Sequence, residues 1–116
     1  MGRQKKTTAK AYPVTITLNA LQNIDEITGY IAFIKQQPHN AIKVGDDLFA
    51  TIDKIAVTPF AYKECEELPT KTKIYRRAVC HSWYIIYRIK PDEIVILGII
   101  HQSRRSSKIK KLQRVK

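Results

Sequence analysis

The sequence has few cysteines and no long hydrophobic run, and these absences exclude several classes of protein. Cys65 and Cys80 are the two cysteines in 116 residues, too few for a disulfide-stapled secreted scaffold, and no paired Cys and His spacing typical of zinc is present. No apolar segment approaches the ~20 residues of a membrane-spanning helix, and the first dozen residues lack a signal peptide's hydrophobic stretch. We therefore expect a cytoplasmic protein with reduced thiols, no metal and no membrane partner.

Glycine-rich loops and familiar catalytic arrangements are also missing. The four glycines are scattered, so they form no phosphate-binding loop, and neither paired catalytic carboxylates nor a Ser/His/Asp arrangement can be recognised. The sequence thus predicts no cofactor. The length, with 44% hydrophobic and 27% charged residues, is typical of one folded domain.

Acidic residues are almost absent from the second half of the chain. Residues 1–69 hold eight Lys and Arg against eight Asp and Glu, whereas residues 70–116 hold thirteen Lys and Arg against Asp92 and Glu93, which accounts for the whole net charge of +11. This asymmetry predicts a polyanionic partner, either nucleic acid or an acidic protein segment, although a solubilising basic surface is the alternative.

The hydrophobic pattern predicts a strand, two helices and then three strands. The expected elements cover residues 12–18, 20–36, 39–57, 73–80, 83–90 and 93–101. Asn19 resembles a helix cap, and the first helix carries an apolar stripe of Ala20, Ile24, Ile27, Ile31 and Ile34. Tight turns are expected at residues 81–82 and 91–92.

These elements predict an α+β fold in which a helical hairpin packs on one face of an antiparallel sheet. The last strand is apolar on both faces, as in the middle of a sheet, and Pro13 favours an edge position for the first. We expect one domain over residues 12–105, with basic, flexible ends at 1–11 and 106–116, although Ile109, Leu112 and Val115 have the spacing of a short helix.

Three sequence pieces carry a resemblance to a known superfamily. They are the helix segment IDEITGYI, the segment IYRRAVCHSWYIIYRI across the predicted meander, and the ending ILGIIHQSRR. In this order they resemble the RelE/ParE superfamily of type II toxin–antitoxin toxins over residues 12–105, with an ending after His101 closer to the ParE branch.

The resemblance implies two different activities. The ParE branch contains plasmid-stabilising toxins that inhibit DNA gyrase, which implies an inhibitor without catalysis that is neutralised by an antitoxin with an acidic and apolar C-terminal segment. The RelE branch contains nucleases that cut messenger RNA on the ribosome. A nucleic-acid-binding module without toxicity is a third hypothesis from a different class.

The candidate site residues lie in the basic half. The nuclease branch places basic groups on the strands and a Tyr or His near the chain end, positions that Arg77, Arg88 and His101 match. An RNA nuclease needs such an acid, a base and cations around the phosphate. For partner binding the candidates are Arg76, Arg77, Arg88, His101, Arg104 and Arg105.

Each candidate also has a structural interpretation. His101 can fix the tail by hydrogen bonding at the sheet end, and His81 is a turn residue that is more often solvated than functional. Arg76 and Arg77 point to opposite faces because strand side chains alternate, and a buried one can pair with the glutamates at 64, 66 or 67. Core packing is also the favoured role of the aromatic residues Trp83, Tyr84 and Tyr87.

Overall fold

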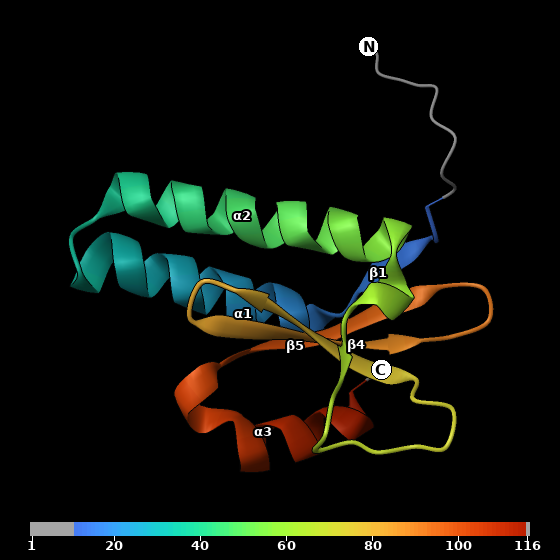
Figure 1. Cartoon of the computed structure of the whole chain (residues 1–116). Coiled ribbons are helices and arrows are strands. Elements are labelled where there is room, and N and C mark those ends of the chain that lie inside the picture. The colour runs from blue at the N-terminus through green and yellow to red at the C-terminus, as the bar shows by residue number, and fades with distance from the viewer. Residues whose placement is uncertain (1–10, 116) are drawn as a thin grey trace.

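A computed structural model describes residues 11–115 and arranges them as a sheet with helices on both faces (Figure 1). The strands are β1 (Val14–Ile16), β2 (Lys63–Glu64), β3 (Tyr75–Cys80), β4 (Trp83–Ile89) and β5 (Ile94–His101). The α-helices are α1 (Leu18–Gly29), α2 (Pro38–Val57) and α3 (Arg105–Lys111). A π-helical turn covers Tyr30–Ile34, and 3₁₀ turns cover Pro59–Ala61, Gln102–Arg104 and Leu112–Arg114. The predicted α+β class is confirmed.

The sheet has the strand order β1-β5-β4-β3-β2. Strands β2 to β5 pair antiparallel, whereas β1 pairs with β5 in parallel. The predicted meander is thus confirmed, and two short strands extend it. β5 lies between two neighbours and is buried on both faces, as its continuous apolar sequence predicted, and Pro13 precedes an edge strand.

Thr17 caps α1, so the prediction that Asn19 does so is wrong. The Thr17 hydroxyl oxygen accepts a hydrogen bond from the Ala20 N–H at 3.1 Å and donates to the Ile96 carbonyl at 2.9 Å. The same side chain therefore satisfies an orphan donor of the helix and fastens the helix to β5. Leu18, expected to continue the first strand, starts α1 instead and is exposed.

A β-bulge in β5 explains what Asn19 does. The register pairs Ile86 with Gly98 and Tyr87 with Ile96, which leaves Leu97 as the extra residue. Asn19 donates to the Leu97 carbonyl at 2.9 Å, and one turn later along α1 Asn23 accepts from the Ile99 N–H at 2.9 Å. Two asparagines of α1 thus bind β5 at and next to the bulge, beyond the last residue that pairs with β1.

The π-helical turn changes the end of the first helical segment. The Lys35 N–H bonds to the Tyr30 carbonyl five residues back, and Gln36, with φ of 56°, reverses the chain before Pro38 opens α2. The wider turn rotates Ile34 away from the face of Ile31. Ile34 is 68% exposed, so its predicted place in the apolar stripe is wrong.

Two hydrophobic cores lie on opposite faces of the sheet. We call the side covered by α1 and α2 the hairpin face and the side covered by α3 the α3 face (Figure 1). The hairpin core contains the buried residues Ile24, Ile31, Leu48, Ile52, Ile55, Ile85, Tyr87 and Ile96, with Ile27 partly buried against them. This arrangement confirms the predicted packing of the helical hairpin.

The C-terminal residues differ from the flexible end expected over 106–116. Residues 105–111 form α3, and Ile109 and Leu112 are buried in the core of the α3 face. Two fully buried aliphatic side chains contribute about 1.5–3 kcal/mol each, which offsets part of the conformational entropy lost when a short helix is ordered. The expectation for 1–11 concerns residues that, except for Ala11, lie outside the described part of the chain.

Candidate functional site

Arg76 braces the connection between α2 and β3. Its guanidinium donates to the carbonyls of Phe60 at 3.0 Å, Tyr62 at 2.9 Å and Lys73 at 2.8 Å, and lies 5.3 Å from the centre of the Phe60 ring. These hydrogen bonds of Arg76 thus go to backbone carbonyls and not to the glutamates at 64, 66 or 67. Because three carbonyls and a ring hold this half-buried side chain, its main contribution is structural.

Arg77 and Arg88 stack on tyrosines of the α3 face. The Arg77 guanidinium lies 4.6 Å from the centre of the Tyr84 ring, and that of Arg88 lies 5.9 Å from the centre of the Tyr75 ring, opposite it in register. Nη1 of Arg77 is buried and has no hydrogen-bond partner among the residues that the structure describes. The other N–H donors of the two stacked guanidinium groups are candidate partners for a carboxylate or phosphate.

His101 lies at the end of β5 on the hairpin face. Its ring meets the indole of Trp83 edge-on, with ring centres 5.7 Å apart. Nδ1 accepts a hydrogen bond from the Ser103 N–H at 3.1 Å, and the Ser103 Oγ lies 2.8 Å away. In the neutral imidazole the proton is therefore on Nε2, which is left as a donor.

The three residues suggested for a nuclease are split between the faces of the sheet. His101 pairs in register with Trp83 and lies on its side, whereas Arg77 and Arg88 contact the tyrosines of the α3 face. Since the backbone of the sheet lies between the two sets, they do not surround one phosphate in this structure.

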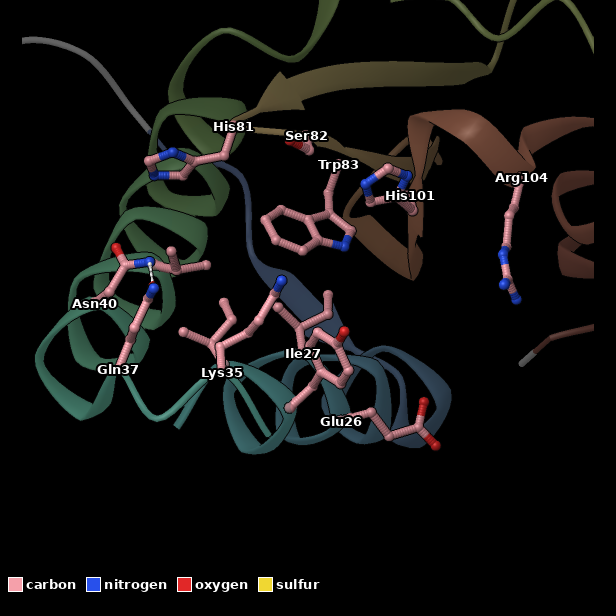
Figure 2. Close-up of a pocket in the computed structure, with 13 residues that line it drawn as sticks. Glu26, Ile27, Lys35, Gln37, Asn40, His81, Ser82, Trp83, His101 and Arg104 are labelled. Carbon is pink, nitrogen blue, oxygen red and sulfur yellow. Dashed lines mark hydrogen bonds between the residues drawn. The ribbon is translucent and has the colours of Figure 1, made fainter. Parts of the chain in front are cut away.

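A pocket of about 610 Å³ opens between the turn end of the helical hairpin and the end of the sheet (Figure 2). Its polar and aromatic lining comes from the first helical segment, the start of α2 and the ends of β4 and β5, namely Glu26, Tyr30, Lys35, Gln37, Asn40, His81, Ser82, Trp83, His101 and Arg104. Figure 2 shows the indole of Trp83 in the centre, with the Lys35 amine directed towards it and Arg104 beyond His101.

His81 fastens the pocket's sheet wall to α2. Its Nε2 lies 2.7 Å from Oδ2 of Asp47, which also accepts from Nζ of Lys43 at 2.9 Å. These hydrogen bonds, that of Lys43 first, hold the pKa of Asp47 below its usual range. His81 has φ of 54°, which non-glycine residues rarely adopt, so the contact with α2 stabilises an uncommon turn conformation.

The remaining candidates lie at the C-terminal edge of the pocket and beyond it. Arg104 is exposed, and Arg105 begins α3 with a side chain outside the described part of the structure. Over the described residues, no three His, Cys, Asp or Glu side chains gather as metal ligands. None of the described helices has the length and hydropathy needed to cross a membrane.

The sequence did not reveal the pocket. Lys35, Gln37 and Asn40 lie more than forty residues before Trp83, and no local pattern connects them with the sheet. The predicted tight turn at residues 81–82 is confirmed, and it is the one part of the pocket that the sequence indicated.

Comparisons with known proteins agree with the observed fold. The family described as ParE toxin of type II toxin–antitoxin system, parDE, matches residues 14–106. A chain of the chromosomal ParDE toxin–antitoxin system from P. aeruginosa is similar at 22% identity and a TM-score of 0.64, covering 78% of this chain and 96% of that one. A chain of the RelBE2 toxin–antitoxin complex from Mycobacterium tuberculosis is similar at 18% identity and a TM-score of 0.50, covering 79% and 99%. No match was found among curated proteins.

Proposed function

The chain belongs to the family of ParE toxins of type II toxin–antitoxin systems, and from this premise we propose that it inhibits DNA gyrase by binding, without catalysing a reaction. The observation that supports binding over catalysis is the separation of His101 from Arg77 and Arg88 by the sheet. An RNA nuclease needs its proton-transfer group and its cations around one phosphate.

We propose that an antitoxin neutralises the toxin through an acidic and apolar C-terminal segment. The two similar structures come from a toxin–antitoxin system and a toxin–antitoxin complex. On this chain, Arg77 and Arg88 offer cations over tyrosine rings, and α3 adds the exposed Lys108, Lys110 and Lys111. A segment that folds on binding can match such a long basic surface.

Co-purification tests the antitoxin proposal. A small protein encoded beside this chain should co-purify with it. The complex should dissociate as the salt concentration rises, because salt screens contacts between exposed charges. A neighbouring small protein that does not bind, or the absence of any such gene, contradicts the proposal.

Charge reversal at the end of the sheet tests the gyrase proposal in growing cells. Arg104→Glu with Arg105→Glu should weaken growth inhibition, whereas His101→Ala should leave most of it, because most single side chains of a binding surface contribute little to its affinity. Lys54→Glu with Lys63→Glu is the matched control, since both lysines are exposed and lie away from the pocket.

The phenotype separates the alternatives. A gyrase inhibitor should cause DNA damage signalling and elongated cells that continue to translate. Rapid arrest of protein synthesis with messenger RNA cut on the ribosome, abolished by His101→Ala, contradicts the proposal and favours the nuclease. Nucleic-acid binding without growth inhibition favours the non-toxic module.

A further inference from the structure

The pocket around Trp83 has the size and composition of a small-molecule site. Its volume of about 610 Å³ falls within the usual 300–1,000 Å³ of ligand pockets, which combine apolar walls with a few polar groups. It lies on the hairpin face, away from Arg77 and Arg88, so the anion-binding surface proposed for the antitoxin does not account for it.

Aromatic rings form the centre of the pocket. Trp83 is partly buried against the hairpin core, the His101 ring meets it edge-on, and Tyr30 is 52% exposed at the same opening. Stacking of a nucleobase on an aromatic side chain contributes about tenfold or more to binding. A flat ring is therefore the ligand part that this wall fits.

Unpaired donors give the pocket an affinity for anions. Lys35 and Arg104 take part in none of the ion pairs found among the described residues, and Nε2 of His101 is free to donate. Figure 2 shows the carboxylate of Glu26, the pocket's one acidic lining residue, pointing away from Trp83. A phosphate group near Arg104 and His101 would meet two donors.

An amide pair at the opposite end provides recognition of a base edge. Nδ2 of Asn40 donates to Oε1 of Gln37 at 3.1 Å, which orients both side chains. Oδ1 of Asn40 remains as an acceptor and Nε2 of Gln37 as a donor. Side-chain amides recognise bases through such donors and acceptors, adenine above all.

We propose that this pocket binds one nucleotide unit, with its base stacked on Trp83, its base edge at Gln37 and Asn40, and its phosphate at Arg104 and His101. In Figure 2 the amide pair and Arg104 lie at opposite ends of the pocket with the indole between them, in the order that such a ligand requires. The unit is either a free mononucleotide or one residue of a single strand. An acidic peptide would use the cations but not the oriented amide pair. The proposal does not depend on the toxin's target.

Tryptophan fluorescence measures occupancy directly, because Trp83 is the single tryptophan of the chain. The full-length protein is titrated with AMP, with ribose 5-phosphate, with a short oligo(dA) strand and with an acidic peptide, exciting at the red edge of the indole band where bases do not absorb. AMP should quench the emission to saturation, whereas ribose 5-phosphate should not, because it has no base to stack. Quenching by AMP identifies a free nucleotide as sufficient, and quenching by oligo(dA) alone identifies the strand.

Two variants test the assigned contacts, and calorimetry checks the affinities. Arg104→Glu should weaken binding by about tenfold or more, as expected for a charge-assisted hydrogen bond that becomes a repulsion. Asn40→Leu, on the exposed first turn of α2, should weaken the binding of AMP without changing the far-UV circular dichroism spectrum. Lys63→Glu, far from the pocket, is the charge control and should bind as the wild type.

Three results overturn the proposal. They are no quenching by either AMP or oligo(dA), equal quenching by ribose 5-phosphate and AMP, and quenching by an acidic peptide alone. If the wild-type protein binds AMP but does not inhibit gyrase, that result contradicts only the proposed target.

Discussion

The Thr17 hydroxyl should contribute more to stability than any other single group at the start of α1. Thr17 is 3% exposed, and its oxygen both caps α1 at the Ala20 N–H and donates to the Ile96 carbonyl. Thr17→Val keeps the shape of the side chain but removes the cap and the hydroxyl donor, which the Ile96 carbonyl shares with the Leu97 carbonyl at 3.2 Å. The cap contributes about 1 kcal/mol and the bond to Ile96 about 1 kcal/mol, so we expect a loss of about 2 kcal/mol.

Thermal unfolding followed by circular dichroism measures this loss. With an unfolding entropy of about 2.1 cal/mol/K per residue, 2 kcal/mol corresponds to a Tm lower by about 8 °C in a chain of this length. Thr17→Ser is the matched control, since it keeps the hydroxyl and loses one methyl group, which costs about 1 kcal/mol. A Val variant as stable as the wild type, or no less stable than the Ser variant, refutes this account of the cap.

Three further predictions follow from single contacts. Burial raises the pKa of Cys65 to about 11, so iodoacetamide at pH 8 should leave this thiol unmodified in the native protein and modify it in denaturant; rapid native labelling in peptide mapping contradicts this. Tyr87→Phe removes the hydroxyl that donates to the Pro59 carbonyl at 2.6 Å and should cost about 1–2 kcal/mol in denaturant titration, whereas an unchanged midpoint contradicts it. Because the pKa of Asp47 is lowered, mainly by Lys43, its stabilisation is present above the ordinary carboxyl pKa and is lost as pH falls through the lowered native value. The Tm of Asp47→Asn should therefore lie below the wild type at pH 7 and low salt and converge with it in acid, and a constant difference contradicts it.

The elements that sequence alone predicted are those with a strong local signal. The segments at 73–80 and 83–90 and the continuous apolar run at 93–101 became β3, β4 and β5, because these patterns and a two-residue turn are local properties. The two-residue β2 has no such signal, since its pairing with β3 is fixed only once the chain returns to the sheet.

Tertiary contacts account for the errors. Asn19 has the sequence features of a cap, but the β5 bulge offers it the Leu97 carbonyl, and Thr17 takes the cap. Charge suggested a flexible C-terminus, yet the spacing of Ile109 and Leu112 matches the second apolar face of the sheet, and their burial there orders the segment.

The candidate site was predicted only in part for the same reason. Strand alternation separates Arg76 from Arg77, and the structure places them in different surroundings, as expected. The separation of His101 from Arg77 depends on the register between strands, including the bulge, which one sequence does not specify. The pocket joins three segments distant in sequence and had no local signature.

A supercoiling assay with purified gyrase tests the central claim most directly. The protein is titrated against gyrase and relaxed plasmid, and in parallel against translating ribosomes with a reporter messenger RNA. A binding inhibitor should stop supercoiling as it approaches equivalence with gyrase and leave the messenger RNA intact, because each toxin molecule acts once rather than turning over. Undiminished supercoiling at excess protein, together with messenger RNA cut by far less than one equivalent per ribosome, contradicts the account.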